Sequence, residues 1–250
     1  MAPSQIGGLQ AWYKADALGL HDGDPVATWT DSSGRGHAAS APGAGQRPSL
    51  VAGAANGLAA VRFDGVDDVV QAKFALAQPA TVVVVYRART DTGANQYVTD
   101  GAVNGAMVEY LNSAQVGMYA GGAAVLTKAP SSFGTFRVLG GVFAGAASAL
   151  YADGGPAVTG ANPGTNTPGG ITVGNSGGAA AAAAVDVAEV VTYDRALSPT
   201  EMDGLGRYLA TRYGLPWTPV GGPTSTTAPP TTVGQEDFGH SSTKPFPSTL

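Results

Sequence analysis

The sequence contains no cysteine, few charged residues and no long apolar segment. The absence of cysteine excludes disulfide bonds, catalytic thiolates and zinc sites with cysteine ligands. Charged residues make up 12% of the 250 positions, about half of the roughly 25% that is usual in globular domains. No apolar run approaches the ~20 residues that a bilayer-spanning helix needs, so no membrane insertion is expected.

Basic residues are scarce as well. The 13 Lys and Arg residues are scattered singly along the chain, and the formal net charge is −5. Binding of a phosphate backbone needs clustered basic side chains, so nucleic acid is not expected as a partner. The N-terminal segment MAPSQIGGLQAWYK lacks the basic and apolar regions of a signal peptide. The sequence therefore predicts synthesis in a host cytoplasm without a signal peptide.

Residues 8–192 show the pattern of a chain built from short β-strands. Segments rich in Val, Tyr, Phe and Trp alternate with turns that contain Gly, Asn or Asp, and glycine accounts for 37 residues. We expect one hairpin to join residues 60–65 to 67–72, and another to join 107–111 to 116–120. Strands at this spacing are typical of an antiparallel sandwich or jelly roll.

The segment 188–215 predicts a closing strand followed by one short helix. Ser198 is a suitable N-cap, and Glu201 stands three residues later, as in a capping box. Pro199 fits the first helical position, and Gly214 can end the helix in the left-handed conformation. This helix should lie against the end of the β-structure.

The composition changes after Leu215. Residues 216–250 include seven prolines and eight threonines, which is typical of an extended linker. We therefore divide the chain into a folded domain, 1–215, and an extended C-terminal arm, 216–250. Phe238 and Phe246 stand among polar residues near the end and are candidates for docking to a partner. A plain disordered tail is the alternative.

Four segments follow one another in a recognisable order: AWYKAD (11–16), WTDSSGRGHAA (29–39), AVRFDGVDD (60–68) and AEVVTYDRALSPTE (188–201). Together they resemble the laminin-G-like, concanavalin A-like jelly-roll domains. The resemblance implies an all-β sandwich of two packed antiparallel sheets, with roughly six strands each and one short C-terminal α-helix. In the segment 29–39, Trp29 is expected to pack and Asp31 and Ser33 to make turn hydrogen bonds.

Domains of this type occur in adhesins, in carbohydrate-binding modules and in virion proteins of tailed bacteriophages. The lack of a signal peptide and the Pro/Thr-rich arm resemble the phage case. The resemblance implies a non-enzymatic virion protein at a minor-tail or tail-tip position, anchored to other virion proteins through residues 216–250. Within the particle, a homo-oligomer is expected. The alternatives are a capsid decoration protein, or a separate carbohydrate-binding module or adhesin that acts on host surface glycans.

Asp64, Asp67 and Asp68 form the densest acidic cluster of the sequence. Calcium prefers several oxygen ligands, and laminin-G-like domains are known to bind it at loop ends, so these residues are a candidate calcium site. Asp-Gly is also the commonest hairpin signal, so the alternative is that Asp64 is a turn residue and that Asp67 and Asp68 start the partner strand. No cofactor other than this calcium is expected.

Glycan binding would need exposed aromatic rings with polar groups close by. Tyr97, Tyr110, Tyr119 and Tyr151 are the candidates, on strands in the middle of the chain. Tyrosines of a sandwich are also commonly half-buried strand residues, which is the structural alternative.

Two patterns that would indicate catalysis are incomplete. A glycosidase of the laminarinase type would carry E-x-D-x-x-E on one strand, and the four glutamates of this chain lack that spacing. Residues 174–178, GNSGG, match G-x-S-x-G, but a nucleophile elbow needs a strand-to-helix turn and strands are expected on both sides. No catalytic residue is therefore predicted. Glu189, in an otherwise apolar strand, is expected to pair with Arg62 or Arg137.

Overall fold

The computed structural model describes residues 1–90, 95–103, 108–111, 115–122, 126–128, 133–179 and 181–221. In 108–111 and 126–128 only the backbone is described.

One antiparallel sheet, sheet A, contains seven strands. They are β1 (Leu9–Lys14), β4 (Ser49–Ala55), β5 (Leu58–Asp64), β7 (Ala80–Ala88), β12 (Arg137–Phe143), β13 (Ala149–Ala152) and β15 (Ala184–Tyr193). Their order is β13-β12-β7-β15-β5-β4, and β1 also pairs with β15. One edge of β15 pairs with β7, while β5 and β1 share the other edge, β5 at its start and β1 at its end.

The second antiparallel sheet, sheet B, contains eight strands. They are β2 (Thr28–Trp29), β3 (Ala39–Ser40), β6 (Val70–Lys73), β8 (Gln96–Asp100), β9 (Val108–Leu111), β10 (Val116–Tyr119), β11 (Leu126–Lys128) and β14 (Gly170–Val173). Their order is β11-β10-β9-β8-β14-β6-β3-β2. The predicted antiparallel sandwich is confirmed, with seven and eight strands in place of about six each. The pairing of β9 with β10 confirms the hairpin expected at 107–120.

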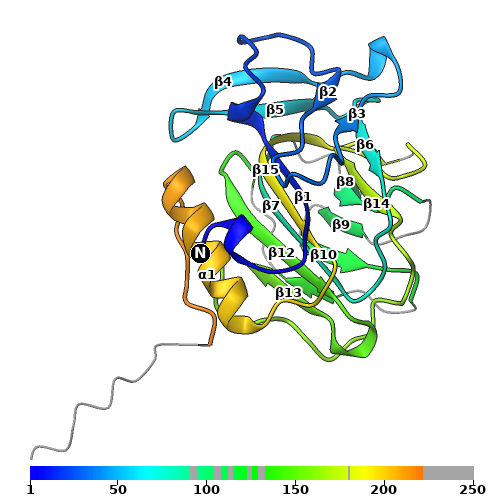
Figure 1. The fold of residues 1–250 in the computed structure, drawn as a ribbon, viewed down its shortest axis with the longest axis vertical. Coiled ribbons are helices and arrows are strands. Elements are labelled where there is room, and N and C mark those ends of the chain that lie inside the picture. The colour runs from blue at the N-terminus through cyan, green and yellow to red at the C-terminus, as the bar shows by residue number, and fades with distance from the viewer. Residues whose placement is uncertain are drawn as a thin grey trace, which may run out of the picture.

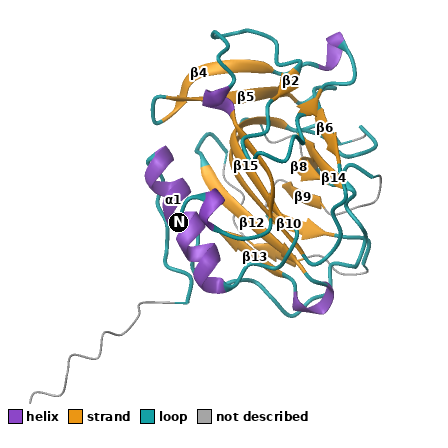
Figure 2. Ribbon diagram, viewed as in Figure 1, coloured by secondary structure: helices purple, strands orange, loops and turns teal. Residues whose placement is uncertain are grey.

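Two apolar layers hold the domain together. The first lies between the sheets and includes Trp29, Phe63 and Met118. The second lies on the outer face of sheet A, under helix α1 (Pro199–Tyr213) and the short 3-10 helix η1 (Pro3–Gln5). Figures 1 and 2 show both helices on that side of the molecule. In the described part of the chain, no helix covers the outer face of sheet B. The remaining 3-10 turns are η2 (Ala15–Ala17), η3 (Ala44–Gln46) and η4 (Gly145–Ala147).

The predicted helix is confirmed, because its start and stop signals are local. Ser198 Oγ accepts a hydrogen bond from the Glu201 N–H, and Glu201 Oε2 accepts one from the Ser198 N–H at 2.9 Å. Gly214 ends the helix at φ 64°. Met202, Leu205 and Leu209 form the face that packs on sheet A. None of the helices in the described residues has both the length and the apolar character needed to cross a bilayer.

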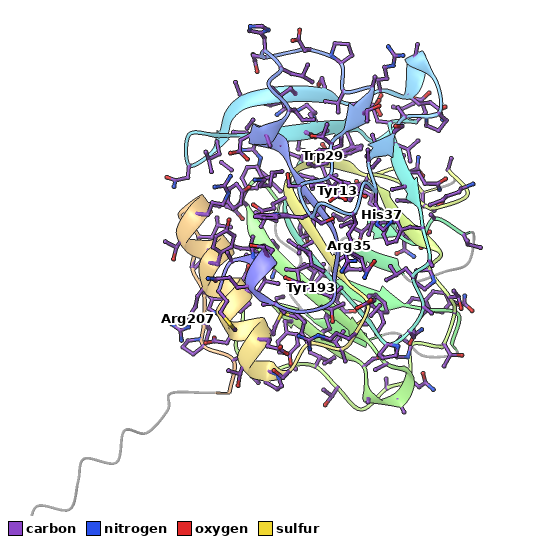
Figure 3. All side chains as sticks on the ribbon, viewed as in Figure 1. Tyr13, Trp29, Arg35, His37, Tyr193 and Arg207 are labelled. Atoms are coloured by element: carbon purple, nitrogen blue, oxygen red, sulfur yellow. The ribbon has the colours of Figure 1, made fainter. Side chains whose placement is uncertain are left out.

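Asp31 organises the N-terminal turn of the segment 29–39. Its carboxylate accepts four hydrogen bonds, from the backbone N–H groups of Trp12, Ser33 and His37 and from the Ser33 hydroxyl. Although burial opposes it, this set of donors holds the pKa of Asp31 below its usual range. Trp29 is fully buried beside Tyr13, as Figure 3 shows. The packing and turn roles expected for this motif are therefore observed.

The first predicted hairpin is wrong. β5 belongs to sheet A and β6 to sheet B, so residues 60–65 and 67–72 do not pair. The turn between them carries the chain from one sheet to the other. A Cβ at Gly65 would lie 2.8 Å from the Ala184 side chain, and its φ of 85° favours glycine. An Asp-Gly signal predicts a tight turn but does not show which sheet the next strand joins.

Candidate functional site: the outer face of sheet B

The outer face of sheet B carries at least two of the four tyrosines predicted to bind glycans. Val98 and Met118 point into the core between the sheets. Because side chains alternate along a strand, the neighbouring Tyr97 and Tyr119 lie on the opposite, outer face. Both rings are partly exposed. Tyr110 belongs to β9, which lies between β8 and β10, and its backbone pairs in register with that of Tyr97. The side chain of Tyr110 is not among those described.

Asp100 ends β8 on the same face. A β-bulge between Tyr97 and Thr99 shifts the alternation, and Asp100 pairs with Thr172, which lies between two core residues of β14. Asp100 is 4% exposed. Its carboxylate accepts hydrogen bonds from the N–H groups of Gly101 and Gly177, each at 2.7 Å.

The surroundings of Asp100 change its ionisation. Burial raises the pKa of Asp100 to about 7, against the two N–H donors that favour the charged form. Burial, the Asp100 charge and Tyr119 raise the pKa of Tyr97 in turn. At neutral pH, Asp100 therefore exchanges between a carboxylate that only accepts hydrogen bonds and a carboxylic acid that also donates one.

Amide and hydroxyl groups extend this surface toward the other edge of the sheet. Gln71 Nε2 donates to Thr172 Oγ1 at 3.0 Å and to the Ala102 carbonyl at 3.3 Å, which fixes the orientation of its amide. Further along, the Thr28 and Ser40 hydroxyls hydrogen-bond to each other at 3.0 Å and both residues are exposed. The face combines aromatic rings with oriented donors and acceptors, which is the chemistry that recognises hydroxyl-rich ligands.

Asp100, Gln71 and Thr172 were not singled out in the sequence. Asp100 stands at the end of a strand next to a glycine, where an acidic residue is unremarkable. Asp100 is singled out by its burial and by the hydrogen bond that it accepts from the Gly177 N–H. Gly177 is 77 positions away in the sequence, so no local pattern encodes this contact. The prediction for Tyr151 is wrong: this fourth candidate is 4% exposed, in the layer under α1, and offers no platform for a sugar.

The three aspartates of the predicted calcium site do meet in space. Oxygen atoms of Asp64, Asp67 and Asp68 lie within 4.8 Å of one another. Asp64 Oδ1 also accepts hydrogen bonds from three backbone N–H groups of this turn, and Asp68 Oδ2 accepts one from the Asp64 N–H. These bonds are those expected of the turn interpretation. They do not test calcium binding, which stays a prediction.

Calcium binding at this turn predicts that millimolar CaCl₂ raises the melting temperature by a few degrees, and that a chelator reverses the rise. Asp67→Asn should abolish the rise and leave the calcium-free melting temperature almost unchanged, because no described residue hydrogen-bonds to the Asp67 carboxylate. Differential scanning calorimetry of both proteins checks this. An identical melting temperature with and without calcium would contradict the prediction.

The other predicted residues are placed as follows. Ser176 lies in the loop between β14 and β15, so the segment 174–178 joins two strands and does not form a nucleophile elbow. Phe238 and Phe246, the candidates for partner docking, lie outside the described residues. The expected partners of Glu189 are wrong: Arg62 pairs with Asp186 and Arg137 with Asp153.

Glu189 instead faces helix α1. A β-bulge between Val187 and Glu189 shifts the alternation of β15 and turns this side chain to the outer face of sheet A. Its carboxylate accepts hydrogen bonds from Trp12 Nε1 at 2.6 Å and from the Tyr213 hydroxyl at 2.8 Å, and lies 3.2 Å from Arg212 Nε. Burial raises the pKa of Glu189 in spite of these partners.

No protein-family model and no curated protein sequence matches the chain. Solved structures do match it. Trypanosoma rangeli sialidase in complex with sialic acid aligns with a TM-score of 0.61 and 15% identity, over 83% of this chain and 33% of that chain. The binding domain of Paraclostridial Mosquitocidal Protein 1 aligns with a TM-score of 0.59 and 12% identity, over 83% and 53%. A mutant of HCR/D aligns with a TM-score of 0.60 and 8% identity, over 86% of this chain and 55% of that chain.

These similarities show a shared fold. The chain has a lectin-like β-sandwich, which is the fold that the resemblance implied. It spans about a third of the length of the sialidase chains and just over half of the other two.

The prediction that this protein is not an enzyme is corrected by the same comparison. Several of the matching structures are sialidases, which are enzymes that contain this fold. The prediction relied on two local sequence patterns, of which one is absent and the other lacks the strand-to-helix context that it needs. Residues far apart in the sequence can still meet in a sandwich: Asp16 and Glu189 both contact the Arg212 guanidinium, although 173 positions separate them. The lack of a local motif therefore does not exclude catalysis.

Proposed function

We propose that this protein binds glycans through the outer face of sheet B, with Tyr97 and Tyr119 as the aromatic platform. The observation that carries the proposal is the position of both rings, partly exposed on the sheet face that no described helix covers. The oriented Gln71 amide lies on the same face, and the charge of the buried Asp100 carboxyl group acts on Tyr97. A sialidase bound to sialic acid is among the structures that share the fold, which supports testing sugars first.

The proposal predicts that Tyr97→Ala lowers the affinity for the bound glycan at least tenfold, because stacking of a sugar ring on an aromatic face is lost; a tenfold loss corresponds to about 1.4 kcal/mol. A glycan array probed with the full chain, with neutral and sialylated glycans, identifies the ligand. Isothermal titration calorimetry then measures the variants.

Tyr97→Phe is the matched control, since it retains the ring and removes only the hydroxyl, and it should keep most of the affinity. Tyr119→Ala should weaken binding as Tyr97→Ala does. If a glycan binds and neither alanine variant changes its affinity, the outer face of sheet B is not the site. If no glycan on the array binds, the proposed function is wrong.

We further propose the setting of a bacteriophage virion, with the chain at a minor-tail or tail-tip position as part of a homo-oligomer. The proposal rests on the laminin-G-like resemblance and on the Pro/Thr-rich arm, 216–250, which would contact other virion proteins. The first residues of the arm contact the domain: Trp217 Nε1 and the Val220 N–H both donate to Asp203 Oδ1. A deletion that tests anchoring should therefore begin after them.

Deletion of residues 222–250 is expected to abolish incorporation into virions and to leave the melting temperature of the purified domain within a degree or two of the intact chain. Mass spectrometry of purified particles measures incorporation. Normal incorporation of the truncated chain would contradict the anchoring role. A Phe238→Ala, Phe246→Ala double variant shows whether the two aromatic residues are responsible.

A further inference from the structure

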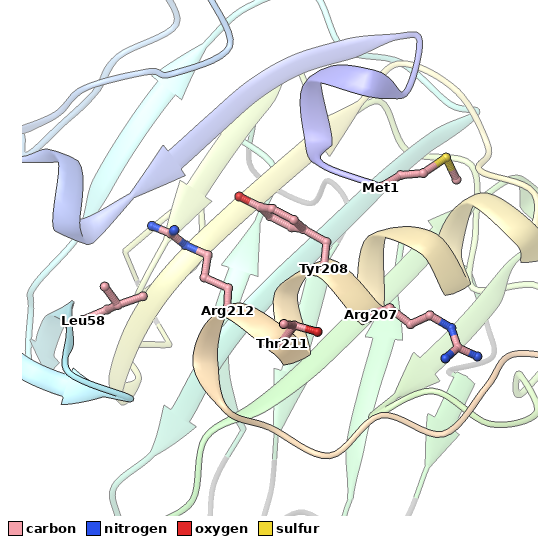
Figure 4. Close-up of a pocket in the computed structure, with 6 residues that line it drawn as sticks. All are labelled: Met1, Leu58, Arg207, Tyr208, Thr211 and Arg212. Atoms are coloured by element: carbon pink, nitrogen blue, oxygen red, sulfur yellow. The ribbon is translucent and has the colours of Figure 1, made fainter.

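A groove with a volume of about 560 Å³ runs along helix α1. It lies on the opposite side of the sandwich from the tyrosine face, the outer face of sheet B with Tyr97 and Tyr119. Figure 4 shows the side chains around it. They are Met1, Leu58, Arg207, Tyr208, Thr211 and Arg212. The volume lies in the range of sites that hold small molecules, and the groove is open to solvent.

Hydrogen bonds fix both rims of this groove to α1. On one rim, Asn56 Nδ2 donates to the Arg212 carbonyl at 3.1 Å and holds the turn that carries Leu58. On the other, the Met1 amino group donates to the Gly204 carbonyl at 2.7 Å. The groove is thus formed by three segments far apart in the sequence and needs no rearrangement to exist, which lowers the entropic cost of binding.

Arg212 is held in place from behind the groove. Its Nη2 contacts Asp16 at 2.6 Å, its Nε lies 3.2 Å from the buried Glu189, and its guanidinium stands over the Tyr213 ring. These contacts leave Nη1 without a hydrogen-bond acceptor among the described residues. The Tyr208 hydroxyl likewise has no partner in the described part of the chain, and in Figure 4 it points toward the Arg212 side chain. An aromatic ring and two oriented donors therefore meet at one end of the groove.

The charged side chains around the groove are three cationic and three anionic groups. Arg212 and Lys14, whose Nζ lies over the Trp12 ring, stand beside Asp16 and Glu189. At the other end, Arg207 pairs with Asp203 at 2.7 Å. The Met1 ammonium adds a fourth cationic group, but the Gly204 carbonyl accepts a hydrogen bond from it, so the groove has only a small electrostatic preference for a charged ligand.

The remaining chemistry favours a sugar over a peptide. Among the described residues, the aliphatic side chains that line the groove are those of Leu58 and Met1, which is too little for the apolar face of an amphipathic helix. The wall is a helix whose backbone groups are bonded internally, so an extended peptide would find no main-chain partners there. Sugar hydroxyls need only side-chain partners, and the apolar face of a pyranose can lie on an aromatic ring.

We propose that this groove is a second binding site, for a neutral saccharide ring that packs on Tyr208 and hydrogen-bonds to the Tyr208 hydroxyl and Arg212. The site is independent of the tyrosine face on sheet B. Because the two lie on opposite sides of the sandwich, one molecule could hold two glycan chains, and a multivalent surface would gain avidity.

The absence of cysteine allows a direct test of position. A nitroxide attached to Arg207→Cys, at the rim of the groove, should broaden the NMR signals of a bound neutral trisaccharide; maltotriose, cellotriose and chitotriose serve as probes, with 3′-sialyllactose as the charged comparison. The matched label on Lys73→Cys, an exposed residue of β6 in sheet B, should leave the signals of a groove-bound sugar sharp. This readout needs no variant of Tyr208.

Tyr208→Ala in the unlabelled full chain should weaken that trisaccharide at least tenfold in NMR titrations, while Tyr208→Phe retains the ring and most of the affinity. Tyr97→Ala should not change the groove-bound signal, which separates this site from the proposed function. If only the Lys73→Cys label broadened the trisaccharide signals, or if only Tyr97→Ala lost binding, the proposed groove site would be wrong. The proposed site on the outer face of sheet B would be unaffected. The proposal would also be overturned if the Arg207→Cys label broadened only the signals of 3′-sialyllactose, or the signals of none of the probes.

Discussion

Asp186→Asn is expected to lower the free energy of unfolding by about 3–5 kcal/mol, because it removes one partner of a buried ion pair. Asp186 is fully buried on the outer face of sheet A. It accepts two hydrogen bonds from Arg62, at 2.7 and 3.0 Å, and two from Arg87, and Arg89 Nε stands 3.6 Å away. Asparagine keeps the volume, but it removes the charge that compensates three partly buried guanidinium groups.

Urea unfolding at pH 7 measures this loss. Asp24→Asn is the control, since its carboxylate is 41% exposed and, among the described residues, contacts only His21, from whose backbone N–H an asparagine oxygen can still accept a hydrogen bond; it should cost less than about 0.5 kcal/mol. A loss below 1 kcal/mol in Asp186→Asn would show that the three arginines find other partners or water.

The pH dependence gives a second check on the same residue. Burial alone would raise the pKa of Asp186, but the bonds from Arg62 and Arg87 hold it below its usual range. A carboxyl group with a lowered folded pKa stabilises the protein above its unfolded pKa of about 3.9, and this contribution is lost as the pH falls through the folded pKa. The difference between wild type and Asp186→Asn should therefore shrink in acid.

The elements that could be predicted from the sequence are those encoded by neighbouring residues. Helix α1 has its N-cap, capping box and closing glycine within seventeen consecutive positions, 198–214, and all three are observed. Tyr97 and Tyr119 were named from the sequence, but that they share the outer face of sheet B follows from the strand register, which only the structure shows. Glycan binding by these residues stays a prediction.

The partners of buried charges could not be predicted in this way. Glu189 was expected to pair with Arg62 or Arg137, but the bulge after Val187 turns Glu189 toward the helix and leaves Asp186 to meet Arg62. A one-residue shift in alternation follows from how three strands fit together, and nothing near Glu189 in the sequence signals it. The groove on α1 has the same origin, since its rims come from segments about 150 and 200 residues distant from the helix.

A second large effect is expected from Asp100→Asn, and it depends on pH. The folded pKa of Asp100, about 7, lies above the unfolded value of about 3.9 because the carboxyl group is buried. Between these two pH values the folded protein binds more protons than the unfolded chain, so its free energy of unfolding falls as the pH rises. At about 1.4 kcal/mol per pKa unit, the whole fall attributable to Asp100 is roughly 4 kcal/mol.

Asparagine does not titrate, so Asp100→Asn removes this fall. It keeps one oxygen to accept from Gly101 or Gly177 and loses the other acceptor, so it should be less stable than wild type near pH 4. Toward pH 8 the order should reverse, and the stability difference between the two proteins should change by roughly 3–4 kcal/mol over this range. Burial also raises the pKa values of Asp68 and Glu189, but both groups are present in both proteins and cancel in the difference. Urea unfolding at intervals from pH 4 to pH 8 tests this; parallel stability curves would show that Asp100 does not titrate near neutrality.

Because the same carboxyl group lies beside Tyr97, glycan binding on sheet B should depend on pH over the same interval in wild type, and Asp100→Asn should abolish that dependence.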